Sequence, residues 1–291
     1  DVRSLCPLET KVIPVADRIC DQPAGWGCFR GRCRSALLKR EGQGLRQNAT
    51  GSLIALWELR VTRQLDRIMV GSGYMQKELL RSGFQEERVV LIPCYRIGAA
   101  GEEAPSPPER AEKLVLCVGR LDVCKGIDQF VGALARIREK VWRAEVVGDG
   151  PQAGALSRLT EELGLGERVR FRGRVPGEVL ADYYRRATLV VVPSRIPESF
   201  GLVGLEAMSY GRPVVAFDVG GVGEWLADGI TGFLVERGDL EGMARRIGQV
   251  LEDPGLALRL GLAGKERVES LFRREAHIRR LVQVYEELHE T

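Results

Sequence analysis

The chain has 291 residues, which predicts two domains, or one large domain with an appendage, at roughly 100–200 residues per domain. Hydrophobic residues make up 44% and charged residues 29%, which excludes a disordered, collagen-like or coiled-coil protein. The 43 basic and 40 acidic side chains nearly balance, so no nucleic-acid partner is expected. No apolar run reaches the roughly 18 residues of a membrane helix, and no signal peptide opens the chain, which favours a cytoplasmic location.

The first part of the chain is rich in cysteine, proline and glycine, a composition typical of loops. The four cysteines there lack the paired C-x-x-C spacing of zinc knuckles, so reduced thiols are favoured over a zinc site. The chain begins at Asp1 without Met, and we expect further sequence upstream. The four cysteines are Cys6, Cys20, Cys28 and Cys33.

Two strand–helix units follow, and they are typical of the end of a parallel α/β domain. Apolar residues at helical intervals come first, then a buried strand, a helix that ends at a glycine, and another strand. We therefore expect a partial first domain, and then a Gly/Pro/Glu/Ala-rich linker. The helical pattern lies at 45–65, the first strand at 66–72, the helix at 74–83 and the second strand at 89–93. The partial domain is expected at 1–98 and the linker at 99–112.

From residue 113 a clearer alternation predicts six strands, each separated from the next by a helix. This order indicates a doubly wound parallel sheet in a second domain at 113–272. The expected strands are 114–119, 143–150, 169–173, 188–194, 213–217 and 232–235, and the expected helices are 126–140, 152–163, 177–187, 200–210 and 220–229. After Asp239 the pattern is helical, with breaks near Pro254 and Arg273.

Ligands bind beyond the carboxyl ends of parallel strands, so the loops there are candidate sites. The loop GRLDVCKG carries Arg120 and Lys125, two cations that suit a pyrophosphate. The alternative is a pair of solvated surface cations. The loop VVGDGP carries Gly148 and Gly150 but lacks the GxGxxG spacing, so a tight turn without a ligand is favoured when this loop is taken alone. FDVGGVGEWL has adjacent glycines before a helix, which suit either a ligand or packing.

The loop and helix PSRIPESFGLVGLEAM carry the most informative pair, Glu198 and Glu206. If all the residues between them were helical, with Phe200 to Val203 as the first turn, the carboxylates would stand roughly 12 Å apart. Paired glycosidase carboxylates stand about 5–9.5 Å apart, so that chemistry is disfavoured. The spacing suits two ends of one extended ligand, with an anion at the helix start. The alternative is a capping acid and a surface glutamate.

Together, GRLxxxKG, VVGDGP, FRGRV, PSRxPESFGLVxLEAM, GRPVVA and GGxxE resemble the motifs of the family 4 retaining glycosyltransferases, the glycosyl transferases group 1 of GT-B fold. The match runs from about Lys113 to Thr291, and DRIMVGS…RVVLIP is similar to the end of that family's first domain. The resemblance implies an α/β protein of GT-B type, with a Rossmann-like nucleotide-sugar domain after an incomplete acceptor-side domain.

The resemblance also implies roles for individual residues. Arg120 and Lys125 would grip the donor pyrophosphate, Glu198 would contact the donor sugar, and Glu206 the ribose. We take Glu198, Arg120 and Lys125 as the candidate catalytic residues. No metal or cofactor is implied, and retention is ascribed to attack assisted by the leaving phosphate. The remaining candidate donor-binding residues are Gly119, Gly148 and Gly150, Arg174 and Val175 at the base, and Phe200, Gly201, Leu202 and Val203 at the phosphates.

The expected function is hexosyl transfer from a UDP- or GDP-sugar to a glycan or lipid-linked acceptor, with retention of configuration. The alternatives are, of a different class, a non-catalytic nucleotide-sugar-binding fragment that lacks a complete acceptor domain and, third, a sugar-nucleotide epimerase of similar fold. The last helix, within 273–291, carries an apolar stripe, and the resemblance implies that this helix packs on the first domain. The competing interpretation is that the stripe contacts the inner face of a membrane. The stripe is Ile278, Leu281, Val282, Tyr285 and Leu288.

Overall fold

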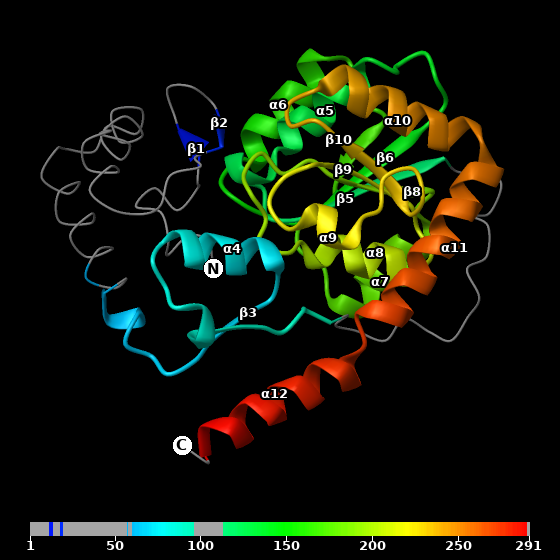
Figure 1. Cartoon of the computed structure of the whole chain (residues 1–291). Coiled ribbons are helices and arrows are strands. Elements are labelled where there is room, and N and C mark those ends of the chain that lie inside the picture. Colours follow the sequence, from blue (N-terminus) through cyan, green and yellow to red (C-terminus); the bar gives the residue numbers. More distant parts are fainter. Residues whose placement is uncertain (1–11, 14–17, 20–56, 58–59, 96–112, 290–291) are drawn as a thin grey trace, which may run out of the picture. The chain divides into compact units, whose positions relative to one another are not determined.

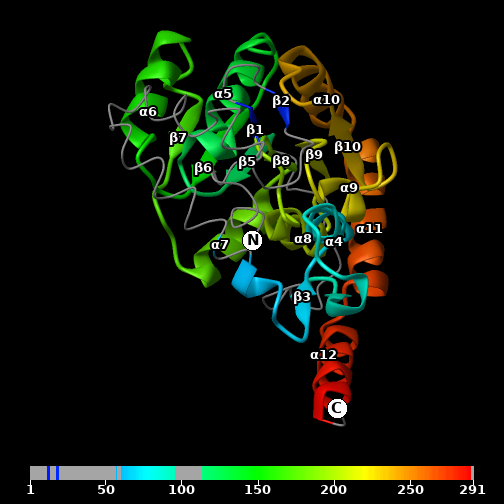
Figure 2. The ribbon, with the colours of Figure 1, turned by 60° about the vertical axis from the view of Figure 1, so that its left-hand side comes forward.

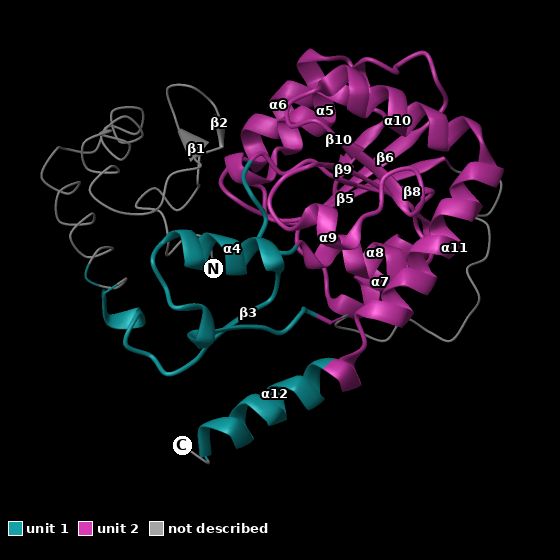
Figure 3. Ribbon diagram, in the orientation of Figure 1, with its two compact units in different colours: residues 1–94, 196–200, 277–291 teal, residues 95–195, 201–276 magenta. Residues whose placement is uncertain are grey.

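The computed structural model describes residues 12–13, 18–19, 57, 60–95 and 113–289 (Figure 1). The chain divides into two compact units (Figure 3). The first unit comprises Asp1–Cys94, Ile196–Phe200 and His277–Thr291, and the second unit comprises Tyr95–Arg195 and Gly201–Ala276. The predicted linker at 99–112 and most of the helix predicted within 45–65 lie outside the described residues.

The second unit is built on one six-stranded sheet in which every pair of neighbouring strands is parallel. Its order is β10-β9-β8-β5-β6-β7, and Figure 2 shows these strands side by side in that order. This order is that of a doubly wound, Rossmann-like sheet, as the alternation predicted. The strands are β5 (Leu114–Val118), β6 (Arg143–Val147), β7 (Val169–Phe171), β8 (Leu189–Val192), β9 (Val214–Phe217) and β10 (Gly232–Val235).

Helices cover both faces of this sheet, with α5, α6 and α10 on one side and α7 and α8 on the other (Figure 1). Strands covered on both faces bury nearly every residue, which explains why β8 and β9 read as continuous apolar runs. The helices and 3₁₀ turn of the second unit are η3 (Val123–Lys125), α5 (Ile127–Ala135), α6 (Ala153–Glu162), α7 (Gly177–Arg186), α8 (Leu202–Ser209), α9 (Val222–Trp225), α10 (Leu240–Glu252) and α11 (Pro254–Leu271).

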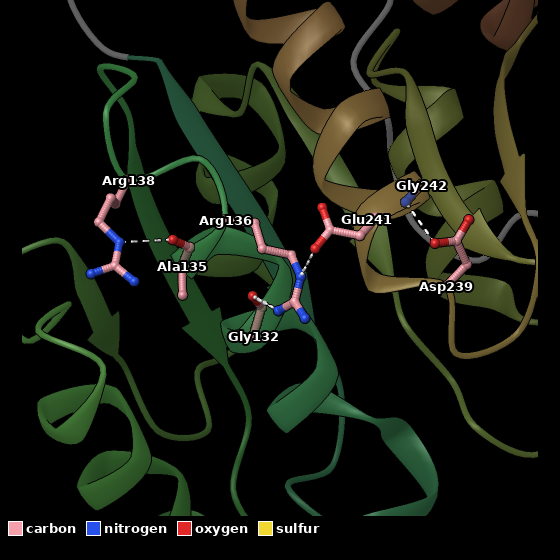
Figure 4. A network of polar contacts seen from close by, with 7 residues as sticks. All are labelled: Gly132, Ala135, Arg136, Arg138, Asp239, Glu241 and Gly242. Carbon is pink, nitrogen blue, oxygen red and sulfur yellow. Dashed lines mark hydrogen bonds and ion pairs between the residues drawn. The ribbon is translucent and has the colours of Figure 1, made fainter.

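The helix predicted at 126–140 is shorter in the structure, because α5 ends at Ala135. Arg136 follows it, donating through Nε to Glu241 Oε1 at 2.6 Å and through a second nitrogen to the Gly132 carbonyl at 2.8 Å (Figure 4). Asp239 caps α10 by accepting from the Gly242 amide at 2.8 Å. The chain thus turns after Ala135, where a basic side chain ties the end of α5 to the start of α10.

The predicted helix breaks are both present. Asp253 separates α10 from α11, accepting from the Leu256 amide at 2.9 Å, and Pro254 occupies the first turn, where a missing N–H costs nothing. The second break falls between Leu271 and α12 (Arg274–His289). Among the described residues, no helix combines the length and apolar character needed to cross a bilayer.

The first unit contains a second parallel pair, β3 (Ile68–Val70) with β4 (Val89–Leu91), connected by α4 (Gly73–Arg81) and the 3₁₀ turn η2 (Glu86–Arg88). An antiparallel pair, β1 (Val12–Ile13) with β2 (Arg18–Ile19), precedes them. Most of α12 belongs to this unit: Val284 is fully buried in a cluster with Val90 and Ile92. Nearby, His277 Nδ1 donates to the Pro93 carbonyl at 2.8 Å.

Candidate functional site

The candidate site lies where the strand order of the second unit reverses, between β5 and β8. The chain leaves β5 toward one edge of the sheet and leaves β8 toward the other, an arrangement at which open α/β sheets bind ligands. The cavity of this unit lies on the β5 side of this point. The loops after β5 and β8 touch at their bases: the Arg195 amide donates to the Cys124 carbonyl at 2.9 Å. A Cβ on Gly126 would stand 2.0 Å from the Pro193 carbonyl oxygen, so only glycine permits this approach.

A cavity of about 510 Å³ opens beyond the carboxyl ends of β5, β6 and β7. It is formed by the predicted GRLDVCKG and VVGDGP loops, by the segment after β7, and by one residue of α7. Five of the lining residues, Val118, Val147, Asp149, Pro151 and Leu180, were not in the predicted set. The full lining is Val118, Gly119, Arg120, Val147, Gly148, Asp149, Gly150, Pro151, Arg174, Val175 and Leu180.

Backbone contacts between neighbouring loops form the floor of this cavity. Gly148 has a φ of 146°, and a Cβ on it would stand 1.8 Å from the Gly119 carbonyl oxygen. The Gly148 amide donates to the Gly173 carbonyl at 2.8 Å, and the Leu121 amide donates to the Asp149 carbonyl at 2.9 Å. Loop packing therefore accounts for glycine at 148, while the same loop also lines the cavity.

Arg120 and Lys125 lie at the two ends of the GRLDVCKG loop, with Asp122 between them. The Arg120 side chain is 63% exposed and pairs through Nε with Asp122 Oδ2 at 2.8 Å. Asp122 Oδ1 accepts from the Lys125 amide at 3.1 Å and so caps η3. The Lys125 charge lowers the pKa of the nearby Cys117 thiol, but burial outweighs it and raises that pKa to about 12.

The helix predicted at 200–210 begins two residues later, because Gly201 adopts a left-handed conformation with a φ of 93°. Phe200 therefore precedes α8, and the assumption that it forms the first helical turn is wrong. Leu202 and Val203 do lie in that turn, where backbone amides face outward without helical partners. Behind them is the fully buried Trp225 ring.

The structure places the two predicted glutamates in different units. Glu198 belongs with Phe200 to residues 196–200 of the first unit, where the Ser72 hydroxyl donates to the Ser199 carbonyl. Glu206 is on α8 in the second unit. Only four residues of α8 precede Glu206 in the helix, so the rise of a continuous helix does not set the separation of the two carboxylates.

Glu206 is a partly buried carboxylate with one firm partner. The Tyr184 hydroxyl, from α7, donates to its Oε2 at 2.8 Å. Burial raises the pKa of Glu206, while this hydrogen bond lowers it. Burial and the neighbouring Glu206 charge together raise the pKa of Tyr184 well above its usual value, so that this hydroxyl stays a donor.

Three structural features near the cavity have no clear signal in the sequence. Tyr184 is one of two adjacent tyrosines, and Leu180 is an ordinary helical leucine. Glu145, on a central strand, is 6% exposed and accepts a bidentate pair from Arg172 at 2.9 and 3.1 Å. This pair holds the end of β7 just before Gly173 and Arg174, of which Arg174 lines the cavity. The sequence alone does not explain an acidic residue on a buried strand, because its partner, Arg172, comes directly after the neighbouring strand of the sheet.

In the described part of the chain, no group of three or more His, Cys, Asp and Glu side chains is arranged to hold a metal ion. The cysteines of the alternative zinc site, Cys6, Cys20, Cys28 and Cys33, lie outside the described residues.

Comparison with known proteins identifies a family that this chain matches. The family model described as glycosyl transferases group 1 matches residues 102–267, a range that includes every predicted site residue. The D-inositol 3-phosphate glycosyltransferase of Nocardia farcinica is 35% identical over 225 residues, 70% of this chain and 49% of that protein. The GDP-mannose-dependent alpha-(1-6)-phosphatidylinositol monomannoside mannosyltransferase of Mycolicibacterium smegmatis is 34% identical over 180 residues, 56% of this chain and 47% of that protein.

Among solved structures, the sucrose-phosphate synthase of Thermosynechococcus elongatus superposes with a TM-score of 0.71 at 34% identity. The superposition covers 82% of this chain and 62% of that one. The chain spans about half the length of the curated relatives it matches.

Proposed function

The chain belongs to the glycosyl transferases group 1 family, with a fold of GT-B type, and on that premise we propose that it transfers a sugar from a nucleotide-sugar donor. The second unit binds the donor in this proposal. The observation that carries it is the cavity at the carboxyl ends of β5, β6 and β7, with Arg120 at its edge and Lys125 on the same loop.

The chemistry of sugar transfer requires stabilisation of a leaving nucleoside diphosphate, whose negative charge grows in the transition state. Arg120 and Lys125 supply two cations for that charge, and the unpartnered amides of Leu202 and Val203 add the positive end of a helix. Groups already fixed by their loops cost little reorganisation when charge develops. No metal ion is needed where protein cations do this work.

The remaining contacts follow from the same donor pose. Backbone near Arg174 and Val175 borders the base, because both residues line the cavity. Glu206 accepts hydrogen bonds from the ribose, and Glu198 from the sugar being transferred. The floor formed by Gly119, Gly148 and Gly150 brings backbone close to the diphosphate without side chains in between.

The finer identity of the reaction is also part of this proposal. We propose a UDP- or GDP-sugar as donor and a hexosyl group as the unit moved, with the configuration retained through attack assisted by the leaving phosphate. A relative named for GDP-mannose and another named for inositol phosphate support these donor and acceptor classes. The acceptor is a phosphorylated polyol, a glycan or a lipid-linked glycan.

Calorimetry with the full chain tests donor binding. UDP, GDP and inorganic pyrophosphate are titrated into the unaltered protein and into Lys125→Ala, with Lys113→Ala, an exposed lysine before β5, as the matched control. Lys125→Ala is expected to cost about 1–3 kcal/mol for all three ligands, the scale of a charge-assisted contact. Lys113→Ala is expected to change nothing.

Equal affinities of Lys125→Ala and the unaltered chain would remove Lys125 from the pyrophosphate site. Absence of binding by the unaltered chain would contradict the donor-binding proposal as a whole. Binding of the nucleotide without any turnover of UDP- or GDP-sugars would instead favour the alternative of a non-catalytic nucleotide-sugar-binding module.

A further inference from the structure

We propose that Tyr184 is a positioning residue for the nucleotide: its hydroxyl fixes Oε2 of Glu206, so that the carboxylate presents Oε1 to the hydroxyl pair of a ribose. This inference rests on the proposed function, since the ribose is part of the nucleoside diphosphate. Tyr184 itself does not touch the ligand and acts only through Glu206.

The position of the Tyr184 hydroxyl is tightly determined. The side chain is 2% exposed, and its ring stacks on that of Tyr210 with centroids 5.4 Å apart and planes within 10°. A buried, stacked ring cannot change rotamer without opening a void. The 2.8 Å hydrogen bond to Oε2 therefore fixes the orientation of the Glu206 carboxylate.

One helix connects this hydrogen bond with the cavity. Leu180 and Tyr184 are four residues apart on α7, so they share a face of the helix. Leu180 lines the cavity, and Tyr184 holds the carboxylate. Within the described part of the chain no second side chain donates to Glu206, so Oε1 retains its capacity to accept from a ligand.

The hydrogen bond also favours the charged form of Glu206. Burial raises the pKa of this carboxyl, and the Tyr184 hydroxyl acts against burial by stabilising the carboxylate. The other titratable groups beside the pair are Tyr210, which stacks on Tyr184, and Cys117, whose thiol burial keeps neutral with a pKa of about 12. Arg185 lies 5.7 Å from the centre of the Tyr210 ring. Tyr184 thus acts on Glu206 in the direction that favours the carboxylate, against the effect of burial.

The test removes one hydroxyl and leaves the ring in place. Tyr184→Phe and its neighbour Tyr183→Phe, a matched loss of one hydroxyl on the same helix, are titrated with UDP, GDP and inorganic pyrophosphate from acidic to neutral pH, because burial raises the pKa of the Glu206 carboxyl. Tyr184→Phe is expected to weaken nucleoside diphosphate binding roughly 5- to 30-fold at neutral pH. The affinity of Tyr184→Phe for pyrophosphate is expected to equal that of the unaltered chain. Tyr183→Phe is expected to bind all three ligands as the unaltered chain does.

The pH profile provides the readout that a merely structural role would not move. Loss of a bond that lowers the pKa of Glu206 raises that pKa, so the carboxylate becomes protonated at a higher pH. The fall in nucleoside diphosphate affinity on the acid side is therefore expected to begin at a higher pH in Tyr184→Phe. The terminal phosphate of the ligand also titrates, with a pKa of about 6, but it does so alike with every variant, so the readout is the difference between the profiles of two variants. In the Glu206→Gln background, Tyr184→Phe is expected to cause no shift of the profile and no further loss of affinity.

Three results would overturn the role of Tyr184 and leave donor binding in place: equal losses of nucleotide and pyrophosphate affinity, a pH profile that Tyr184→Phe does not shift, or a Glu206→Gln protein whose pH profile equals that of the unaltered chain. The last needs only Glu206→Gln and holds even if Tyr184→Phe does not fold. If the unaltered chain binds pyrophosphate but neither nucleotide, or binds none of the three, the proposed function fails and the role of Tyr184 fails with it.

Discussion

At the scale of single residues, Arg120 is held by an acid of its own loop, because its Nε pairs with Asp122 Oδ2 at 2.8 Å. A phosphate that binds Arg120 must compete with this carboxylate. Asp122→Asn removes the competing charge and keeps an oxygen that can accept from the Lys125 amide. We expect Asp122→Asn to tighten pyrophosphate and nucleoside diphosphate binding by about 0.2–1 kcal/mol, the range of exposed ion pairs, as measured by calorimetry.

Asp149→Asn is the matched control for this prediction. Asp149 also lines the cavity and also accepts from a backbone amide, that of Gly150 at 2.7 Å. The same change of charge there leaves the Arg120–Asp122 pair intact. If both variants tighten binding equally, the gain comes from the overall charge of the cavity, and the pairing with Asp122 does not restrain Arg120.

At the scale of elements, the start of α8 depends on the fit between Gly204 and the Trp225 ring. A Cβ on Gly204 would stand 2.0 Å from the ring of Trp225, a fully buried side chain. We expect Gly204→Ala to lower the free energy of unfolding by about 1–3 kcal/mol, because overpacking a core forces the backbone to shift. Denaturant unfolding followed by fluorescence measures this change.

Gly177→Ala supplies the control, since a Cβ there would meet no atom within 4 Å and the residue opens α7. It is expected to leave stability unchanged or slightly raised, because alanine favours helix more than glycine does. A Gly204→Ala protein as stable as the unaltered one would show that the ring moves aside, and that α8 does not depend on this contact.

At the scale of the whole molecule, the last helix completes a small core whose other members lie far earlier in the chain, because Val284 packs on Val90 and Ile92. We expect Val284→Ala to lower the free energy of unfolding by about 1–3 kcal/mol through the cavity it leaves. Val282→Ala, the same change at a residue 47% exposed, is expected to have little effect. Thermal and denaturant unfolding check both variants.

The membrane alternative for this helix makes the opposite prediction. If the exposed residues Ile278, Val282 and Tyr285 enter a lipid surface, Val282→Asp should reduce binding to vesicles that contain anionic lipid, at unchanged stability. No vesicle binding by the unaltered chain would leave packing within the first unit as the role of α12.

Much of the fold could be predicted from the sequence because the necessary signals are local. Apolar runs of four to six residues, glycines at helix ends and the caps at Asp239 and Asp253 identify strands and helices without reference to distant residues. The GRLDVCKG and VVGDGP loops likewise follow their strands directly, so their place at the carboxyl edge follows from the alternation. The errors were at ends: α5 stops at Ala135, and Gly201 delays α8.

Local signals in the sequence were enough to predict the alternation of strands and helices, the second unit's parallel sheet, and the loops that carry Arg120 and Lys125. The order of strands around β5, the Tyr184–Glu206 hydrogen bond, the Glu145–Arg172 pair and the assignment of Glu198 to the first unit emerged only from the folded structure. The physical reason is that backbone conformation and periodicity are set by near neighbours along the chain. A contact between distant side chains exists only after burial of both faces of the sheet has chosen which elements adjoin.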